Sequence, residues 1–168
     1  MFRIVEAQEE HVEAIRLILD YYVVHTCVTW RAETPTVEAM KEKFEQRRLH
    51  PWLVALNNFG VVIGFAYAAK FRDTAGWAET AELSIYLNQE STGQGIGSAL
   101  LSEMVSQCRR NGFSVLVSLI STEEGTDLGK ASVAMHLRAK FQHFGLLKGC
   151  GKKFGRTMDC TFLSLSLK

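Results

Sequence analysis

The sequence predicts an α/β protein built on a central, mixed and mostly antiparallel sheet that is flanked by helices on both faces. Two strand-like runs meet at the turn sequence Asn57–Gly60, which is typical of a hairpin and therefore of antiparallel strands. The second half of the chain then follows the order strand, helix, strand, which indicates a crossover between parallel strands. Because the 168 residues contain no linker, repeat or low-complexity stretch, we expect residues 1–168 to form a single domain.

Helical spacing and strand-like alternation locate the elements of the first half. Apolar residues recur at helical spacing from Val12 to Tyr22, so we expect an amphipathic helix there. A second helix should begin near Thr36, whose hydroxyl, followed by Glu38, resembles an N-cap, and should end before Pro51. The strands predicted in this half are Phe2–Val5, Trp52–Leu56 and Val61–Ala68.

The second half continues with strands and helices in alternation. Apolar side chains from Ile96 to Cys108 line one face of a predicted helix that ends at Asn111–Gly112. We expect a last helix over Ala131–Phe144. The strands predicted in this half are Thr80–Leu87, Phe113–Ile120 and Cys160–Leu167.

The charge balance argues against nucleic acid or an anionic membrane surface as a partner. The formal net charge of +1 offers no basic footprint. Lys152, Lys153 and Arg156 are too few to change this, and we interpret them as part of a solvated turn. The sequence has no apolar run of about 18 residues and no signal peptide, so we expect a cytoplasmic protein.

The cysteines and histidines do not indicate a metal site. No two cysteines form a Cys-x-x-Cys pair, so neither a zinc site nor a thioredoxin motif is predicted, and reduced thiols are expected. His136 and His143 lie seven residues apart without a clear third ligand, so we expect no metal. The cysteines are Cys27, Cys108, Cys150 and Cys160.

The stretch STGQGIGSALL, residues 91–101, places Gly93, Gly95 and Gly97 at alternate positions just before a predicted helix. A glycine-rich turn at a helix N-terminus exposes backbone N–H groups beside the positive end of the helix dipole, which favours a bound anion such as phosphate. The alternative is a tight turn that needs only the positive φ that glycine tolerates.

Two other phosphate-binding motifs do not fit the sequence. The dinucleotide-binding fingerprint would require glycine at Ser98 and an early position in the chain. A P-loop in the stretch EGTDLGKAS would require glycine at Glu124 and serine or threonine at Ala131.

Six stretches carry a family resemblance, in the order PWLVAL, VVIGFAYAAKFR, TAELSIYL, GQGIGSALL, SVAMH and KKFGRTMD. With them the chain resembles the phosphinothricin-type N-acetyltransferases of the GNAT superfamily over nearly its whole length. The resemblance implies the GNAT fold and acetyl-CoA as cosubstrate, with the CoA pyrophosphate on the backbone amides of the glycine turn and the pantetheine arm along a strand edge. The CoA-binding residues it implies are Ile85, Tyr86, Leu87, Gly93, Gln94, Gly95, Ile96, Gly97, Ser98 and Ser132.

Acetyl transfer to an amine requires a base, because only the neutral amine attacks a thioester. Glu82 interrupts an apolar strand just before the CoA-facing segment, where a partly apolar cleft would raise its pKa toward neutral pH. We therefore predict Glu82 as the base. The alternative is an exposed strand carboxylate, since Glu79 lies nearby. An unpaired N–H within residues 85–87 could stabilise the oxyanion of the tetrahedral intermediate.

The CoA thiolate that leaves must gain a proton. In the superfamily the acid is commonly a tyrosine on the late helix, and the matching position here is His136, which family members of this type also carry. His136 is therefore a candidate for the acid, for an orienter of Glu82 or for a substrate contact. The alternative is a histidine packed on a helix face.

Departures from the family pattern concern both substrates. Thr92 stands where the superfamily usually has Gln or Arg, and Gly129 stands where the family has an asparagine that would help to hold pantetheine. The family's second arginine, two residues after Arg72, is Thr74 here, and a hydroxyl does not replace a bidentate guanidinium. We therefore expect phosphinothricin to be a poor substrate.

The resemblance also indicates where the acceptor amine binds. The acceptor-side residues that it implies are Arg72, Thr74, Thr29 and Trp30. For Arg72 the alternative is a surface residue paired with Asp73 or Glu79.

The sequence as a whole predicts an acetyl-CoA-dependent N-acetyltransferase that acts on a small amine. An amino acid or an analogue, such as phosphinothricin or methionine sulfoximine, is the expected kind of acceptor. The alternative function is a degenerate acyl-CoA-binding module with a sensing or regulatory role and no turnover. The resemblance also suggests a homodimer.

Overall fold

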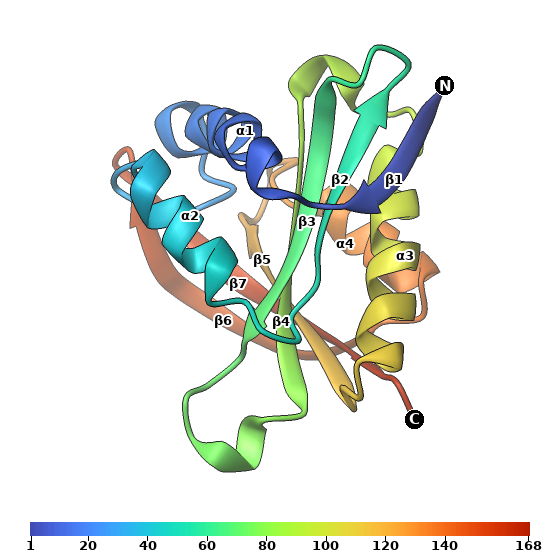
Figure 1. Cartoon of the computed structure of the whole chain (residues 1–168). Coiled ribbons are helices and arrows are strands. Elements are labelled where there is room, and N and C mark those ends of the chain that lie inside the picture. The colour runs from blue at the N-terminus through green and yellow to red at the C-terminus, as the bar shows by residue number, and fades with distance from the viewer.

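A computed structural model describes residues 1–168 and contains one seven-stranded sheet in the order β1-β2-β3-β4-β5-β7-β6 (Figure 1). Only β4 and β5 pair in parallel, and every other neighbouring pair is antiparallel. The predicted mixed, mostly antiparallel sheet is therefore confirmed. The strands are β1 (Phe2–Glu6), β2 (Trp52–Asn57), β3 (Val62–Lys70), β4 (Thr80–Leu87), β5 (Val115–Thr122), β6 (Gln142–Lys153) and β7 (Arg156–Ser166).

The helices cover both faces of this sheet, as predicted. Helices α1 (Val12–His25) and α2 (Val37–Glu45) pack on one face, and α3 (Ile96–Arg110) and α4 (Lys130–Arg138) pack on the other (Figure 1). The Thr36 hydroxyl accepts a hydrogen bond from the Ala39 N–H at 3.1 Å, which confirms the expected N-cap of α2. None of the helices is long and apolar enough to cross a bilayer.

Strand β2 shows how the sequence builds a core on each side of the sheet. Successive side chains on a strand point to opposite faces, and the run WLVAL has no polar residue to present to water. Trp52 and Val54 belong to the core under α1 and α2, whereas Leu53 and Ala55 belong to the core under α3. The sheet is thus buried on both faces at its centre.

The predicted helix over Ala131–Phe144 is wrong in its second half. Helix α4 ends at Arg138, and Lys140 adopts a left-handed conformation with φ 70° while the Phe141 N–H bonds the His136 carbonyl at 3.0 Å. Residues from Gln142 onward form the edge strand β6, and β7 begins at Arg156 rather than at Cys160.

Strand β6 lacks the alternation that would have revealed it in the sequence. Its register with β7 shifts between His143 and Gly145 and again between Leu147 and Gly151. The first irregularity adds one residue to β6 and so reverses which side chains lie on which face, the second adds two residues, and most of the strand is exposed on both faces. A period of two therefore does not appear in this stretch of the sequence.

Candidate active site

Strands β4 and β5 part after their first residues and open a cleft in the sheet. They are paired only at Thr80–Glu82 of β4 and residues 115–117 of β5. Beyond this point, residues 83–87 and 118–121 line a cleft of about 600 Å³. Because β5 does not pair with this part of β4, an extended ligand can take its place along the strand edge.

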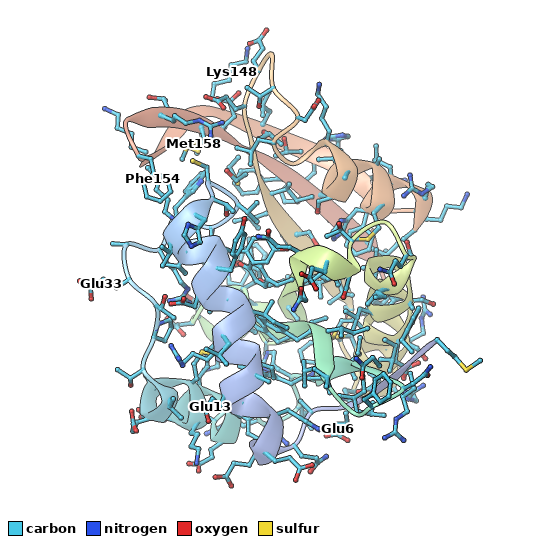
Figure 2. All side chains as sticks on the ribbon, turned by 90° about the horizontal axis from the view of Figure 1, so that it is seen from above. Glu6, Glu13, Glu33, Lys148, Phe154 and Met158 are labelled. Carbon is cyan, nitrogen blue, oxygen red and sulfur yellow. The ribbon has the colours of Figure 1, made fainter.

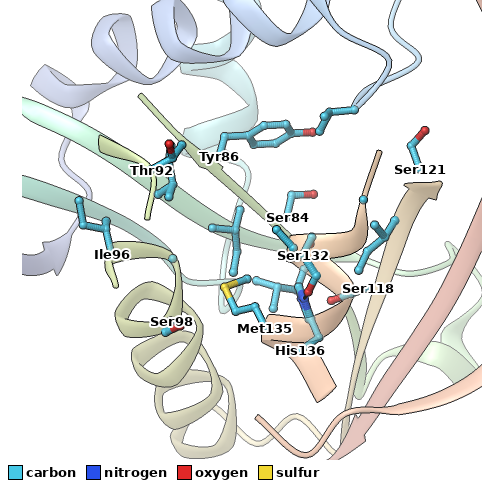
Figure 3. A pocket seen from close by; sticks show the side chains of 18 of the residues that line it. Ser84, Tyr86, Thr92, Ile96, Ser98, Ser118, Ser121, Ser132, Met135 and His136 are labelled. Atoms are coloured by element: carbon cyan, nitrogen blue, oxygen red, sulfur yellow. Dashed lines mark hydrogen bonds between the residues drawn. The ribbon is translucent and has the colours of Figure 1, made fainter. Parts of the chain in front are cut away.

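The cleft is lined from both faces of the sheet. On the α3 side it is lined by the glycine turn and by α4, and on the α1 side by Tyr22, Val28 and Tyr86. Figure 3 shows Ile96 and Ser98 in the first turn of α3, with Tyr86 across the cleft. All of the predicted CoA-binding residues except Gln94 line this cleft, namely Ile85, Tyr86, Leu87, Gly93, Gly95, Ile96, Gly97, Ser98 and Ser132.

Gln94 and Thr92 behave differently in the turn. The Gln94 side-chain amide donates a hydrogen bond to the Glu90 carbonyl at 3.0 Å and does not line the cleft. Thr92 lines the cleft, but its hydroxyl donates to the Gln89 carbonyl at 3.1 Å. Both side chains donate to backbone carbonyls of the preceding residues, so anion binding in this turn would rest on the backbone N–H groups.

Backbone conformation and close packing explain why the turn has glycine at three positions. Gly93 and Gly95 have φ of 74° and 80°, which other residues rarely adopt, and Gly95 is the N-cap of α3. At Gly97 a Cβ would lie 3.1 Å from Sδ of Met135, so glycine lets α3 approach α4 closely. The first N–H groups of α3 have no partner within the helix. The turn is both a conformational requirement and a candidate anion site.

Glu82 lies on the α1 face of β4, opposite Ala69 of β3 and Val117 of β5, where β4 and β5 begin to part. Its side chain is half-buried and forms no ion pair. Burial raises the pKa of the Glu82 carboxyl, and the positive charges of Arg72 and Lys43 oppose this shift. A carboxylate in this setting suits a general base better than a fully exposed one does.

Replacing Arg72 by alanine should move the acid limb of the pH–rate profile to higher pH. The Arg72 cation favours the ionised form of Glu82, so its removal raises the pKa of that carboxyl. A general base works only when ionised, so kcat/KM would begin to fall at a higher pH than in the wild type. Steady-state kinetics on a neutral amine from about pH 5 to pH 9 measure the shift.

The control for this experiment is Lys41→Met. Lys41 lies on α2, like Lys43, but its ammonium group pairs with Glu9. The profile of this variant should match that of the wild type. An unmoved acid limb in Arg72→Ala would contradict the electrostatic link between Arg72 and Glu82.

His136 on α4 faces the cleft in a defined tautomer. The residue is 3% exposed, and Nδ1 of its ring lies 2.8 Å from the Ser132 carbonyl oxygen, which can only accept a hydrogen bond. The neutral ring therefore carries its proton on Nδ1 and presents a lone pair at Nε2, which has no partner within the protein. Burial also lowers the pKa of His136. As an acid, His136 would first have to gain a proton at Nε2.

Ser118 on β5 was not identified from the sequence. The residue is 2% exposed and lines the cleft (Figure 3), and its hydroxyl, like Nε2 of His136, has no hydrogen-bond partner. His143, in contrast, lies exposed on β6, and no group of three or more His, Cys, Asp or Glu side chains is arranged to hold a metal.

The predicted acceptor-side residues lie apart from the glycine turn. Thr29 is buried and interacts with the Tyr86 side chain, and Trp30 Nε1 donates to Oγ of Ser121 on the cleft wall at 2.9 Å. Arg72 and Thr74 are exposed and do not line the cleft.

Arg72 forms no ion pair with Asp73 or Glu79. Its Nη1 donates to the Phe71 carbonyl at 2.7 Å, and its guanidinium carbon lies 4.1 Å from the centre of the Phe71 ring. Glu79 instead pairs with Lys168. Arg72 therefore has no carboxylate partner, although its charge lowers the pKa of the Glu82 carboxyl.

Lys43 is a second cation near Glu82 that the sequence did not reveal. Its Nζ lies 4.1 Å from the centre of the Tyr67 ring, and Tyr67 neighbours Glu82 diagonally across β3 and β4. Lys43 is half-buried and forms no ion pair. Lys43 lies near Glu82 only because α2 packs on the sheet. The apolar periodicity of α2 does not predict which residue of the sheet Lys43 will approach.

Gly129 has a steric reason to depart from the asparagine of the family pattern. It is the N-cap of α4 with φ 77°, and a Cβ at this position would overlap the Ser121 carbonyl oxygen. An asparagine side chain would not fit at this point of the present backbone.

Comparisons with known proteins agree with this geometry. Residues 13–141 match the acetyltransferase (GNAT) family. The L-methionine sulfoximine/L-methionine sulfone acetyltransferase of Salmonella typhimurium is 33% identical over 156 residues, which cover 92% of this chain and 88% of that protein. The L-amino acid N-acyltransferase MnaT of Escherichia coli is 32% identical over 163 residues, which cover 96% of this chain and 91% of that protein.

A solved structure shows the same fold. The phosphinothricin acetyltransferase of Sinorhizobium meliloti in complex with acetyl-CoA superimposes with a TM-score of 0.91 at 32% identity, over 98% of this chain and 88% of that one. The GNAT fold expected from the resemblance is thus confirmed. The chain belongs to the GNAT family of acetyltransferases.

Proposed function

We propose that the cleft binds acetyl-CoA and that the acetyl group passes to the amine of a small, amino-acid-like molecule. The observation that carries this proposal is the parting of β4 and β5 beside a glycine turn at the N-terminus of α3. The turn offers N–H groups to the pyrophosphate, and the uncovered edge of β4 offers backbone groups to the pantetheine arm. A groove with both features suits an elongated cosubstrate with an anionic end.

The proposed reaction takes place at the α1 side of the cleft. Glu82 accepts a proton from the ammonium form of the acceptor, directly or through water, and the neutral amine attacks the thioester carbonyl carbon. A backbone N–H of residues 85–87 stabilises the oxyanion. The attacking nitrogen then loses its second proton, the C–S bond breaks to leave the amide, and the CoA thiolate takes a proton. His136 can supply that proton only from its doubly protonated ring.

The acceptor proposed here carries an acidic group as well as the amine. Arg72 and Lys43 are cations without a carboxylate partner, and the charge of each lowers the pKa of the Glu82 carboxyl. An acidic group held by either cation would leave the amine of the same small molecule near the base. The relative from Salmonella typhimurium is named for amino-acid analogues of this kind, and this supports the assignment.

The variant Thr74→Arg should improve the acetylation of phosphinothricin. Thr74 is exposed two residues after Arg72, so an arginine there adds a second guanidinium that can form charge-assisted hydrogen bonds with an acidic substrate. A gain of about ten- to a hundredfold in kcat/KM is expected, as for one such contact. The release of free thiol from acetyl-CoA measures the rate.

Arg72→Ala removes a guanidinium from the surface to which Thr74→Arg adds one. It should lower the turnover of acidic acceptors more than that of neutral amines. Efficient acetylation of phosphinothricin by the wild type would show that the acceptor site is wrongly placed. So would an unchanged rate of Arg72→Ala on acidic acceptors.

We further propose that a second copy of the chain covers the edge of the sheet at β6. This strand pairs only with β7 and leaves its other edge open, and Phe144, Leu146 and Leu147 are each more than half exposed. An open edge with apolar side chains is a surface that proteins normally cover. A mass of one chain in solution, measured by light scattering at micromolar concentration, would refute this dimer.

A further inference from the structure

The turn between β6 and β7, which contains Phe154, lies beside the C-terminal end of α1 (Figure 2). Lys153, the last residue of β6, contacts three backbone carbonyls there. Its Nζ lies 2.6 Å from the Val23 oxygen, 2.9 Å from the Thr29 oxygen and 3.5 Å from the Tyr22 oxygen. The last four carbonyls of a helix have no partner within the helix, and a cation there is favoured by the helix dipole. The expectation that Lys153 lies in a solvated turn is therefore wrong.

Lys153 holds these carbonyls without an acidic partner. It is half-buried and forms no ion pair, and its burial lowers the pKa of its ammonium group. Its neighbour Lys152 is exposed, and Arg156 pairs with Glu123. Of the three basic residues in this stretch, only Lys153 donates to the backbone of α1 and of the segment that follows it.

The segment Thr26–Arg31, called the acceptor loop below, is held from two further sides. At Gly151 of β6 a Cβ would lie 2.5 Å from the Trp30 ring, so glycine is needed for the ring to rest on this strand. On the other side Trp30 donates to Ser121 of β5 at 2.9 Å. The acceptor loop therefore bridges the hairpin of β6 and β7 to the wall of the cleft.

The acceptor loop carries the side chains that border the α1 side of the cleft. Val28 lines the cleft, and Thr29 and the Arg31 cation both lower the pKa of Tyr86 on β4, against the larger rise that its burial causes. A shift of this loop would therefore move the wall that an acceptor must pass, while the glycine turn on the other face of the sheet would stay in place.

We propose that Lys153 is a positioning residue for the acceptor substrate, because its three N–H donors fasten the acceptor loop to the end of α1. This proposal rests on the proposed function for its kinetic consequence, but not for its structural one. The compact ammonium can reach carbonyls from three directions, whereas the planar guanidinium of an arginine cannot reproduce this arrangement.

The test is Lys153→Met, which keeps much of the length of the side chain and removes every donor. The KM for the acceptor amine should rise about tenfold or more, because the loop would hold its binding-competent conformation in a smaller fraction of the molecules, while the KM for acetyl-CoA stays within about twofold. Lys152→Met, at the exposed neighbouring position, is the matched control and should leave both values unchanged. Lys153→Arg should recover only part of the loss.

Amide hydrogen exchange of residues 26–31 provides a second measurement that needs no turnover. Exchange should become about tenfold faster in Lys153→Met and remain unchanged in Lys152→Met. If Lys153→Met does not fold, Ser121→Ala removes the anchor of Trp30 from the other side and should raise the same acceptor KM and the same exchange rates.

The outcomes separate this inference from the proposed function. Unchanged exchange in the acceptor loop, or equal increases in both KM values, would overturn the positioning role of Lys153. Faster exchange in the loop together with no thiol release from the wild type, with any amine, would support the positioning of the loop and overturn the proposed function.

Discussion

Replacing Glu82 by glutamine is expected to lower kcat by about a hundredfold or more, the loss typical of removing a general base. The amide keeps the shape and most of the contacts of the side chain, but it cannot accept a proton from the ammonium group. Acetyl-CoA binding should stay near that of the wild type, because Glu82 lies on the α1 face and does not line the cleft. Steady-state kinetics on an accepted amine, with a thermal-shift titration of acetyl-CoA, measure both quantities.

Glu79→Gln is the matched control for Glu82. Glu79 lies just before β4, is exposed and bonds Ser114 and Lys168, so the loss of its charge should leave kcat near that of the wild type. Full activity of Glu82→Gln on a confirmed substrate would remove Glu82 from the mechanism.

Replacing Gly95 by aspartate is expected to abolish most of the binding of acetyl-CoA. The position has φ 80° at the N-cap of α3, so a side chain is strained there and its carboxylate would repel the pyrophosphate. At a ligand concentration of a hundred times Kd, binding stabilises a protein by about 2.7 kcal/mol. A hundredfold weaker affinity would leave only about 0.4 kcal/mol at that concentration, so the rise in Tm should nearly vanish.

Gly60→Asp controls for strain and charge in this experiment. Gly60 has φ 78° in the turn between β2 and β3, and a Cβ there, as at Gly95, meets nothing within 4 Å. It lies outside the cleft, so acetyl-CoA should raise its Tm as it does in the wild type. An equal response of Gly95→Asp and the wild type would refute the assignment of the glycine turn to the pyrophosphate.

Local features of the sequence were sufficient to predict much of the fold and the glycine turn that lines one side of the cleft. The glycine turn, the helix from Ile96 and the strand with Glu82 each depend on neighbours within about a dozen residues, where periodicity and turn chemistry act. Strand β6 was missed because its two irregularities hide the alternation and because an exposed edge needs no apolar face.

The α1 side of the cleft depends on contacts between distant parts of the chain. Lys153 meets Val23 across 130 positions of the sequence, and Lys43 reaches the neighbourhood of Glu82 only through the packing of α2 on the sheet. No pattern within either segment encodes these meetings. The partnerless Nε2 of His136 and hydroxyl of Ser118 likewise depend on how α4 packs on β5.

The most direct test of the central claim, that this cleft transfers acetyl groups, is the release of free thiol from acetyl-CoA by the wild-type protein with and without a small amine. We expect thiol release that depends on the amine, with one acetyl group appearing on the amine nitrogen for each thiol formed. Amino acids, their analogues and polyamines form the panel of acceptors. An acyl-CoA-binding module without turnover would show a rise in Tm with acetyl-CoA and no thiol release with any amine, and that result would contradict the account.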